Sequence, residues 1–281
     1  MAGVDVHLTD FQNIFNLEGK VAVVTGGSRG FGLQVASGLL QAGCSKIYIT
    51  SRDAQACEEA LNALNALPCR RPGAKAIAVP ADCSMVSELD RLAAKVAETT
   101  DHIDILFANA GATWGAPFEK TAPDTFSKVM DLNVKSVFYT VQKLEPLLKK
   151  NATNGDPSRV IVTASITGMG LGTLGQNATY AYSASKAAAI HLAKNLAVDL
   201  GPRGIITNAI CPGFFPTKMA SGLVDLQGGF EALRQETPNR RVGQPEDIAG
   251  LVVFLSSRAS RHLNGAAIAI DGGYILNKGK L

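Results

Sequence analysis

A glycine-rich turn between a buried strand and a helix is the feature that most restricts the fold of this 281-residue chain. Residues 20–25 (KVAVVT) form a β-branched apolar run, which is typical of a strand buried on both faces. Residues 26–32 (GGSRGFG) follow, and then a helical pattern over residues 33–42. Glycine allows a tight turn, and a helix N-terminus offers free N–H groups, so this order predicts a loop that binds a pyrophosphate. A glycine turn that serves packing alone is the alternative.

Apolar runs and helical patterns alternate along the rest of the chain. Further strands are predicted at residues 46–50, 75–80, 103–108, 159–164, 205–210 and 266–270, and residues 211–213 (CPG) are expected to break the strand before them. Helices are predicted at 53–67, from Ser84 or Ser87 to 100, and at 123–150, 182–200 and 245–256. This alternation predicts the α/β class: a doubly wound parallel seven-stranded sheet with helices on both faces, of the Rossmann type.

No linker, repeat or low-complexity tract divides the chain. We therefore expect residues 1–16 to be an N-terminal extension and residues 17–281 to form a single dinucleotide-binding and catalytic domain. Residues 214–241 are less periodic and contain Gly228-Gly229. We expect them to form a mobile segment of short helices on the substrate side.

Charge and cysteine content narrow the class of partner and the compartment. The formal charge is +3 with no basic block, so nothing indicates binding to nucleic acid or a membrane surface. Five cysteines without CxxC spacing favour neither a zinc site nor disulfides, and no metal is expected. Residues 1–16 lack the features of a secretory signal, and no apolar run is long enough to span a membrane. We expect a cytoplasmic protein, although residues 279–281 (GKL) resemble the peroxisomal Ser-Lys-Leu tail.

The end of the second strand bears on the choice of dinucleotide. An acidic residue there binds the ribose 2′-hydroxyl of NAD, whereas an arginine accommodates the 2′-phosphate of NADP. The chain has Ser51 and Arg52 at this point, and Arg29 in the glycine loop is placed to converge on the same phosphate. Asp53 opposes this interpretation, but it is better explained as the N-cap of the next helix. The sequence therefore favours NADP.

Polar residues and glycines follow several other predicted strands. They are Asp82 and Cys83, then Asn109, Ala110 and Gly111, then Ser165, and finally Pro212 and Gly213. Ligands of doubly wound sheets bind at the carboxyl ends of the strands, so these residues are expected to surround one site.

Tyr182 and Lys186 open a helical segment and lie four residues apart, so both side chains lie on one face of a helix. A cation beside a phenol lowers its pKa, which suits a general acid. A solvated pair on a helix surface is the alternative. Tyr180 lies six residues before Lys186 and falls off that face.

In combination these motifs closely resemble the short-chain dehydrogenase/reductase family, over residues 17–275. The resemblance rests on Thr25-Gly26-x-x-x-Gly30-x-Gly32, Asn109-Ala110-Gly111, Asn133, Ser165, Tyr182-x-x-x-Lys186 and Pro212-Gly213. It implies a catalytic tetrad. Tyr182 would protonate the carbonyl oxygen, Ser165 would hydrogen-bond that oxygen, and Lys186 would lower the pKa of Tyr182 and hold the nicotinamide ribose. Asn133 would kink its helix and hold a water that links Lys186 to solvent.

The resemblance also implies NADP(H) as cofactor, with Asp82 at the adenine and Thr217 at the nicotinamide end. The expected cofactor-binding residues are Gly26, Ser28, Arg29, Gly30, Phe31, Gly32, Ser51, Arg52, Asp82, Cys83, Asn109, Ala110, Gly111, Tyr182, Lys186, Pro212, Gly213, Phe215 and Thr217.

One departure from the family pattern concerns the substrate. The family's serine usually precedes the tyrosine by about a dozen residues, but Ser165 and Tyr182 are 17 apart, so the loop at 166–179 is longer. A similar loop and the segment 212–216 (PGFFP) occur in the reductases named for rhamnolipid biosynthesis, which are close to 3-oxoacyl-carrier-protein reductases. This looser resemblance suggests NADPH-dependent reduction of a ketone, such as a 3-oxoacyl or polyketide-like group, to a secondary alcohol.

Two other functions stay open at this point. The same residues would serve NADP-dependent oxidation of a secondary alcohol. The other function is not enzymatic: the chain would be a non-catalytic NADP-binding sensor or scaffold. The resemblance further implies a homodimer or homotetramer that acts on a small-molecule carbonyl substrate.

Overall fold

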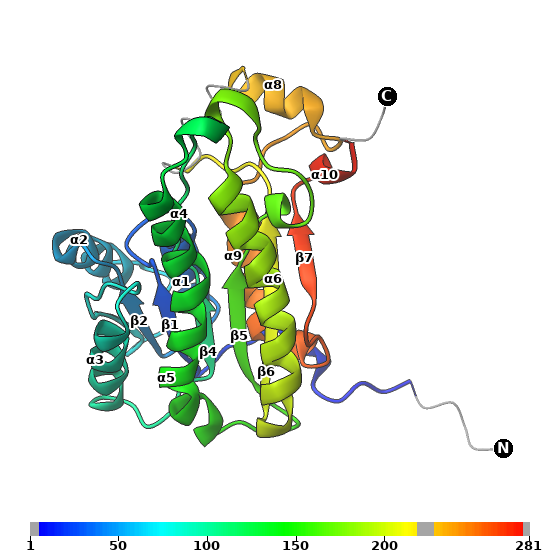
Figure 1. The fold of residues 1–281 in the computed structure, drawn as a ribbon. Helices are drawn as coiled ribbons and strands as arrows, with labels where there is room; N and C mark the ends of the chain where they lie inside the picture. The colour runs from blue at the N-terminus through cyan, green and yellow to red at the C-terminus, as the bar shows by residue number, and fades with distance from the viewer. Residues whose placement is uncertain (1–5, 218–227, 278–281) are drawn as a thin grey trace.

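Seven parallel strands form one sheet in the order β3-β2-β1-β4-β5-β6-β7 (Figure 1). The structure is a computed structural model, and it describes residues 6–217 and 228–277. The strands are β1 (Val21–Thr25), β2 (Lys46–Thr50), β3 (Lys75–Ala78), β4 (Ile105–Ala108), β5 (Ser158–Thr163), β6 (Ile205–Pro212) and β7 (Ala267–Ile270). The prediction of a parallel, seven-stranded sheet of the Rossmann type is confirmed.

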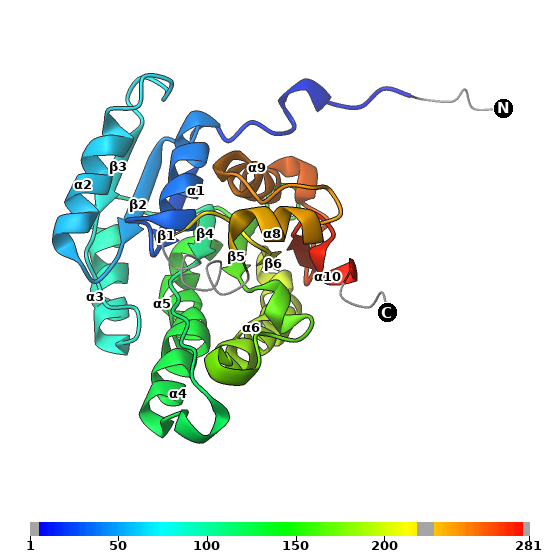
Figure 2. The same cartoon turned by 90° about the horizontal axis from the view of Figure 1, so that it is seen from above.

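Helices cover both faces of this sheet, as the view from above shows (Figure 2). One face carries α1 (Gly30–Gln41), α2 (Ala54–Asn65) and α9 (Pro245–Ser256), and the other carries α3 (Val86–Ala97), α5 (Ser136–Lys150) and α6 (Tyr180–Leu200). The described residues also form the shorter helices α4 (Pro123–Met130), α8 (Gly229–Glu236) and α10 (Tyr274–Asn277). Short 3₁₀ turns lie at Phe11–Asn13, Phe118–Lys120, Ile166–Gly168, Gly175–Asn177, Gly201–Arg203 and Arg258–Ser260.

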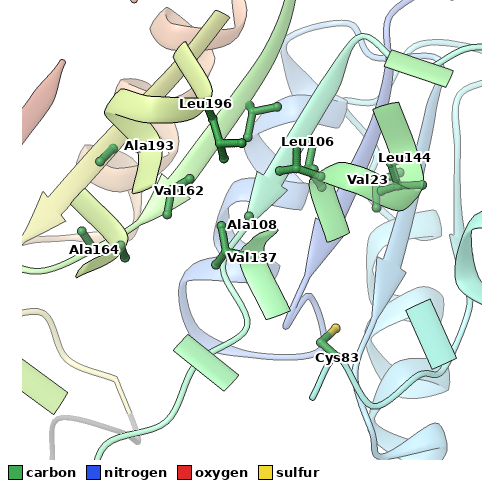
Figure 3. Close-up of a cluster of buried hydrophobic side chains, with 14 of the residues drawn as sticks. Val23, Cys83, Leu106, Ala108, Val137, Leu144, Val162, Ala164, Ala193 and Leu196 are labelled. Carbon is green, nitrogen blue, oxygen red and sulfur yellow. The ribbon is translucent and has the colours of Figure 1, made fainter. Parts of the chain in front are cut away.

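The core between the central strands and α5 and α6 is built from small and branched apolar side chains (Figure 3). Val23, Leu106 and Val162 come from β1, β4 and β5 and are fully buried. Leu144 and Ala193 of the helices pack against this same cluster. Full burial of a valine or leucine contributes roughly 1.5–3 kcal/mol. The sheet therefore has a firmly packed interior, and the loops at the carboxyl ends of its strands start from fixed positions.

The helical stretch predicted at residues 123–150 is present, and it consists of α4, a π-helical segment at Asp131–Lys135 and α5. Two local predictions were wrong. Neither Ser84 nor Ser87 starts α3: Met85 is its N-cap, and Ser84 instead hydrogen-bonds the carboxylate of Asp82. β6 does not end before residue 211, because Pro212 still pairs with Ile270 of β7.

Some predictions fall on residues outside the described ranges. These are the first five residues of the N-terminal extension, the centre of the segment 214–241 at residues 218–227, and the tail at residues 279–281. The described residues of the extension run away from the body of the domain, and Asp10 pairs there with Arg258 (Figures 1 and 2). Within the described ranges, no helix combines the length and apolar character needed to cross a membrane.

A cluster of charged side chains ties the strands together at their amino ends. Lys20, just before β1, lies 2.9 Å from Asp104 and 2.6 Å from Asp156. Asp156 also pairs with Arg159, whose side chain is only 1 % exposed and donates a further hydrogen bond to the carbonyl of Ser257. Burial alone would raise the pKa of Asp156, but hydrogen bonds from Lys20 and Arg159 outweigh it and hold the pKa below its usual value.

We predict that Asp156→Asn lowers the free energy of unfolding by about 2 kcal/mol at pH 7, because it leaves the buried Arg159 without its carboxylate partner. A lowered folded-state pKa stabilises above the unfolded value near ~3.9 and is lost as pH falls through the folded value. The difference in the free energy of unfolding between the wild type and Asp156→Asn should therefore shrink below about pH 4. Urea denaturation at several pH values measures it.

Asp199→Asn is the matched control, because Asp199 pairs with Arg203 on the surface and its side chain is 71 % exposed. Exposed pairs contribute ~0–1 kcal/mol, so this variant should barely change stability. Equal effects of the two substitutions would contradict a special role for the cluster.

Candidate active site

A cavity of about 1300 Å³ opens at the carboxyl ends of the strands. Its wall is formed by the loops after β1 to β6 and by α10. Most of the predicted site residues lie in this wall: Gly26, Ser28, Arg29, Gly30, Phe31, Ser51, Arg52, Asp82, Cys83, Asn109, Ala110, Gly111, Ser165, Tyr182, Lys186, Pro212, Gly213, Phe215 and Thr217. Gly32 and Asn133 do not line it. Tyr180 is also outside the lining, and its ring packs edge-on against Phe118.

The glycine loop turns sharply and packs closely on itself. Gly26 and Gly30 have φ values of +64° and +53°, a region that side-chain-bearing residues rarely adopt. A Cβ on Gly32 would lie 2.1 Å from the carbonyl oxygen of Gly26, so only glycine fits there. Arg29 is the N-cap of α1, and no side chain caps the helix. The free N–H groups of the first turn are thus available to an anion in the cavity.

Asn109 ties the loops after β1, β4 and β5 to one another. Its amide nitrogen donates to the carbonyl of Thr25 at 3.0 Å, and its carbonyl oxygen accepts from the hydroxyl of Thr163 at 3.2 Å. The hydroxyl of Thr25 in turn accepts from the backbone N–H groups of Asn109 and Ala110, at 2.9 and 3.0 Å. These bonds hold the cavity wall in place at the centre of the sheet.

The end of the cavity near β2 contains two guanidinium groups. Arg29 and Arg52 both line it, and neither forms an ion pair with any residue in the ranges 6–217 and 228–277. The carboxylate of Asp53 accepts the backbone N–H of Ala56 at 3.0 Å and caps α2. One carboxylate oxygen of Asp82 is similarly engaged by Ser84. Positive charge is therefore more available than negative charge at this end.

Asn133 lies in the π-helical segment and is 1 % exposed. Its side-chain oxygen accepts the N–H of Ala112 at 2.8 Å, and its amide nitrogen donates to the carbonyl of Ala112 and to the hydroxyl of Ser185, both at 2.9 Å. Ser185 then donates to the backbone carbonyl of Tyr182 at 2.7 Å. Asn133 thus connects the loop after β4 to the first turns of α6, and its side chain has a structural reason to be buried.

Ser165, Tyr182 and Lys186 meet in the centre of the cavity. Ser165 hydrogen-bonds Tyr182, and the Lys186 ammonium lies 5.5 Å from the centre of the Tyr182 ring. Lys186 is 4 % exposed and donates to the carbonyl of Thr163 at 2.7 Å. The hydroxyl of Thr167 donates to that of Ser165 at 3.1 Å. A phenol, a hydroxyl and an amine therefore face the same space.

The lowering of the Tyr182 pKa by Lys186 stays a prediction. Burial raises the pKa of the Tyr182 phenol, and the hydrogen bond with Ser165 offsets it only in part. Burial also lowers the pKa of Lys186 to about 8. The ammonium bonds to the carbonyl of Thr163 and faces the ring of Tyr182, so the loss of water around the phenol dominates.

Several residues of this site were not identified from the sequence. Thr163 accepts from Lys186 and donates to Asn109, and Ser185 joins Asn133 to Tyr182. The sequence signals that could have identified them were the hydroxyl of Thr163 at the end of a buried strand and the position of Ser185 next to Lys186. The cavity wall on the side of the long loop also includes Ala112, Thr113, Leu132, Leu171, Thr173, Leu174, Phe214, Tyr274 and Ile275.

Comparison with known proteins identifies the family. Residues 26–275 match a family model described as enoyl-(acyl carrier protein) reductase. The chain belongs to the short-chain dehydrogenase/reductase family. It is 40 % identical over 263 residues to the rhamnolipids biosynthesis 3-oxoacyl-[acyl-carrier-protein] reductase of Pseudomonas aeruginosa, covering 93 % of this chain and 98 % of that protein. The prediction of a short-chain dehydrogenase/reductase enzyme is confirmed.

Solved structures of short-chain dehydrogenases/reductases are similar throughout. The Pseudomonas aeruginosa RhlG/NADP active-site complex superposes with a TM-score of 0.85 at 39 % identity, covering 93 % of this chain and 98 % of that one. A gluconate 5-dehydrogenase of Burkholderia cenocepacia in complex with NADP and tartrate superposes with a TM-score of 0.82 at 29 % identity. The match covers 93 % of this chain and 97 % of that one. Members similar in fold thus differ in the compounds for which they are named.

We predict that Gly32→Ala lowers the free energy of unfolding by about 1–3 kcal/mol, because the added methyl group must displace the backbone of Gly26. Gly250→Ala in α9 is the control, since a Cβ there meets nothing within 4 Å. Alanine in a helix loses less entropy than glycine, so the control should be neutral or slightly stabilising. Equal stability of the two variants in urea denaturation would contradict the close packing of the loop.

Proposed function

We propose that this protein reduces a ketone to a secondary alcohol with NADPH, and that Tyr182 is its general acid. The observation that carries the proposal is the meeting of Tyr182, Ser165 and Lys186 in one cavity with the glycine loop. The phenol of Tyr182 and the hydroxyl of Ser165 both line this cavity, so each can turn its single O–H donor to one carbonyl oxygen.

The cavity fits a dinucleotide with a 2′-phosphate. The glycine loop offers close backbone approach and a helix N-terminus for the pyrophosphate. Arg29 and Arg52 supply positive charge at the end of β2, and Asp53 is engaged as the cap of α2. An arginine rather than a free acid at this position favours NADP over NAD. When bound, the nicotinamide supplies the hydride that the carbonyl carbon receives.

The protonation state of Tyr182 suits the role of an acid in reduction. Burial raises the pKa of its phenol, so the group is protonated at neutral pH and can donate to the oxygen that becomes the alcohol. Oxidation of an alcohol needs the phenolate, which this environment disfavours. Ser165 supports the developing negative charge on the same oxygen.

Lys186 is the proposed positioning and proton-supplying group. Its amine has a pKa lowered to about 8, so it remains largely protonated at pH 7. From its bond to Thr163 it faces the ring of Tyr182 and the cavity. It is thus placed to hold the sugar next to the nicotinamide and to favour return of a proton to Tyr182.

A 3-oxoacyl group is the ketone class we propose first, supported by the similarity to the reductase named for rhamnolipid biosynthesis. We also propose that the protein works as a homodimer or homotetramer. Phe126, Phe138 and Val198 on α4, α5 and α6 are 37 %, 39 % and 79 % exposed, which supports contact between copies through these helices.

We predict that Tyr182→Phe lowers kcat for ketone reduction by about 10²–10⁴-fold, the usual contribution of a general acid, while NADPH binding changes little. Tyr180→Phe is the matched control, because Tyr180 opens the same helix but lies outside the cavity lining. NADPH oxidation in steady state and fluorescence titration of NADPH measure the two quantities. Undiminished turnover by Tyr182→Phe would remove this residue from the proposed mechanism.

We predict that the double variant Arg29→Ala/Arg52→Ala raises KM for NADPH by about 10–100-fold and leaves KM for NADH nearly unchanged, because only NADPH carries the 2′-phosphate. Arg203→Ala is the control, since Arg203 is paired on the surface with Glu145 and Asp199. A parallel rise in KM for both cofactors would contradict recognition of the phosphate by these arginines.

A further inference from the structure

The long loop between Ser165 and Tyr182 is anchored on α6 by two glycines. A Cβ on Gly168 would lie 2.6 Å from the backbone carbon of Lys186, and one on Gly172 would lie 2.0 Å from the hydroxyl of Ser183. The backbone N–H of Thr179 also donates to the carbonyl of Thr173 at 3.0 Å, which closes the end of the loop. The loop therefore has a defined path beside the catalytic helix.

Beside the second anchor point the loop presents two leucines to the cavity. Leu171 and Leu174 both line the cavity, and their side chains are 77 % and 60 % exposed. A loop that needed only to cover the site would gain nothing from exposed leucines, because each leaves apolar area in water. The loop also approaches α10 at Gly170, because a Cβ on Gly170 would lie 3.3 Å from the side chain of Ile275.

The rest of this part of the wall is apolar or uncharged. Leu132, Ile166, Phe214 and Ile275 line it together with threonines and glycines. Among the described lining residues, the charged groups are confined to Arg29, Arg52, Asp53, Asp82 and Lys186, at the end of the glycine loop and at the reaction centre.

The wall next to α10 also has little capacity to accept an anion. Tyr274 lines the cavity, is 4 % exposed and donates its hydroxyl to the carboxylate of Glu236 at 3.1 Å. Burial and this carboxylate raise the pKa of Tyr274 to about 12, so its phenol stays neutral. A carboxylate on the substrate would thus lie near the carboxylate of Glu236, and none of the described cations of the cavity wall belongs to α10 or to the loop at 166–179.

We propose that Leu171 and Leu174 are specificity-determining residues that contact an apolar, uncharged chain attached to the reacting ketone. The inference rests on the proposed ketone reduction and adds the chemistry of the substrate beyond the carbonyl. Neither leucine touches the reacting atoms. They act by covering the chain, so that its apolar area leaves water as the substrate binds.

The test uses methyl ketones with alkyl chains of rising length, from ethyl to octyl, and follows NADPH oxidation. In the wild-type protein each added methylene should raise kcat/KM about two- to threefold, somewhat below the roughly fourfold value of a fully buried methylene. In Leu171→Ser/Leu174→Ser this dependence should flatten, so that kcat/KM falls most for the longest ketones. Leu276→Ser is the matched control, because Leu276 of α10 is 83 % exposed and does not line the cavity.

A second comparison tests whether this part of the cavity disfavours a substrate chain that carries a negative charge. Methyl butyl ketone is set against the compound of the same length in which a carboxylate replaces the terminal methyl group. The proposal expects kcat/KM to fall at least tenfold for the carboxylate.

The outcomes separate the two proposals. An equal dependence on chain length in the wild type and the double serine variant, or equal use of the carboxylate, would overturn the role of the leucines and leave ketone reduction standing. If the protein bound NADPH but reduced no ketone of the series, ketone reduction itself would fail and this inference with it. Unchanged thermal unfolding and NADPH affinity of the serine variant show that the loop alone has been altered.

Discussion

The hydrogen bonds of the Asn133 amide are the interaction on which the geometry of the site most depends. They join the loop after β4, through Ala112, to α6, through Ser185 and the carbonyl of Tyr182. A buried amide left without partners would cost about 1–3 kcal/mol for each unsatisfied group, so losing any of these bonds would destabilise the connection. The π-helical turn at Asp131–Lys135 is the backbone conformation in which they form.

Close approach of backbone to backbone is the second constraint. Gly32 packs on Gly26, and Gly168 packs on the backbone of α6 beside Lys186. The first contact shapes the loop at the head of α1, and the second brings the long loop against α6. Residues of both loops line the cavity, so glycines far apart in the sequence help to fix the course of its wall.

The sheet could be predicted from the sequence because its strands are short β-branched runs buried on both faces, and such runs are a local signal. The same holds for the strand ends, where Asn109 and Ser165 were correctly expected at one edge. The family resemblance implied a kink at Asn133, but its π-helical form and its bonds could not be predicted, because they depend on partners at Ala112 and Ser185 that are distant in the sequence. Pro212 continues β6 for a similar reason: its pairing with Ile270 outweighs its local tendency to break a strand.

The electrostatics of the reaction centre depend on burial in a way that spacing alone does not reveal. The helical spacing of four residues places Lys186 near Tyr182, but the lysine bonds to Thr163 and the phenol faces the cavity. Burial favours the neutral form of each group, so the phenol keeps its proton while the pKa of the amine approaches neutrality. A catalytic group works best with a pKa near the working pH, and burial moves the amine of Lys186 toward that value. A phenol that is protonated at rest, beside an amine that can return the proton, suits a reaction in which the oxygen of the substrate gains a proton.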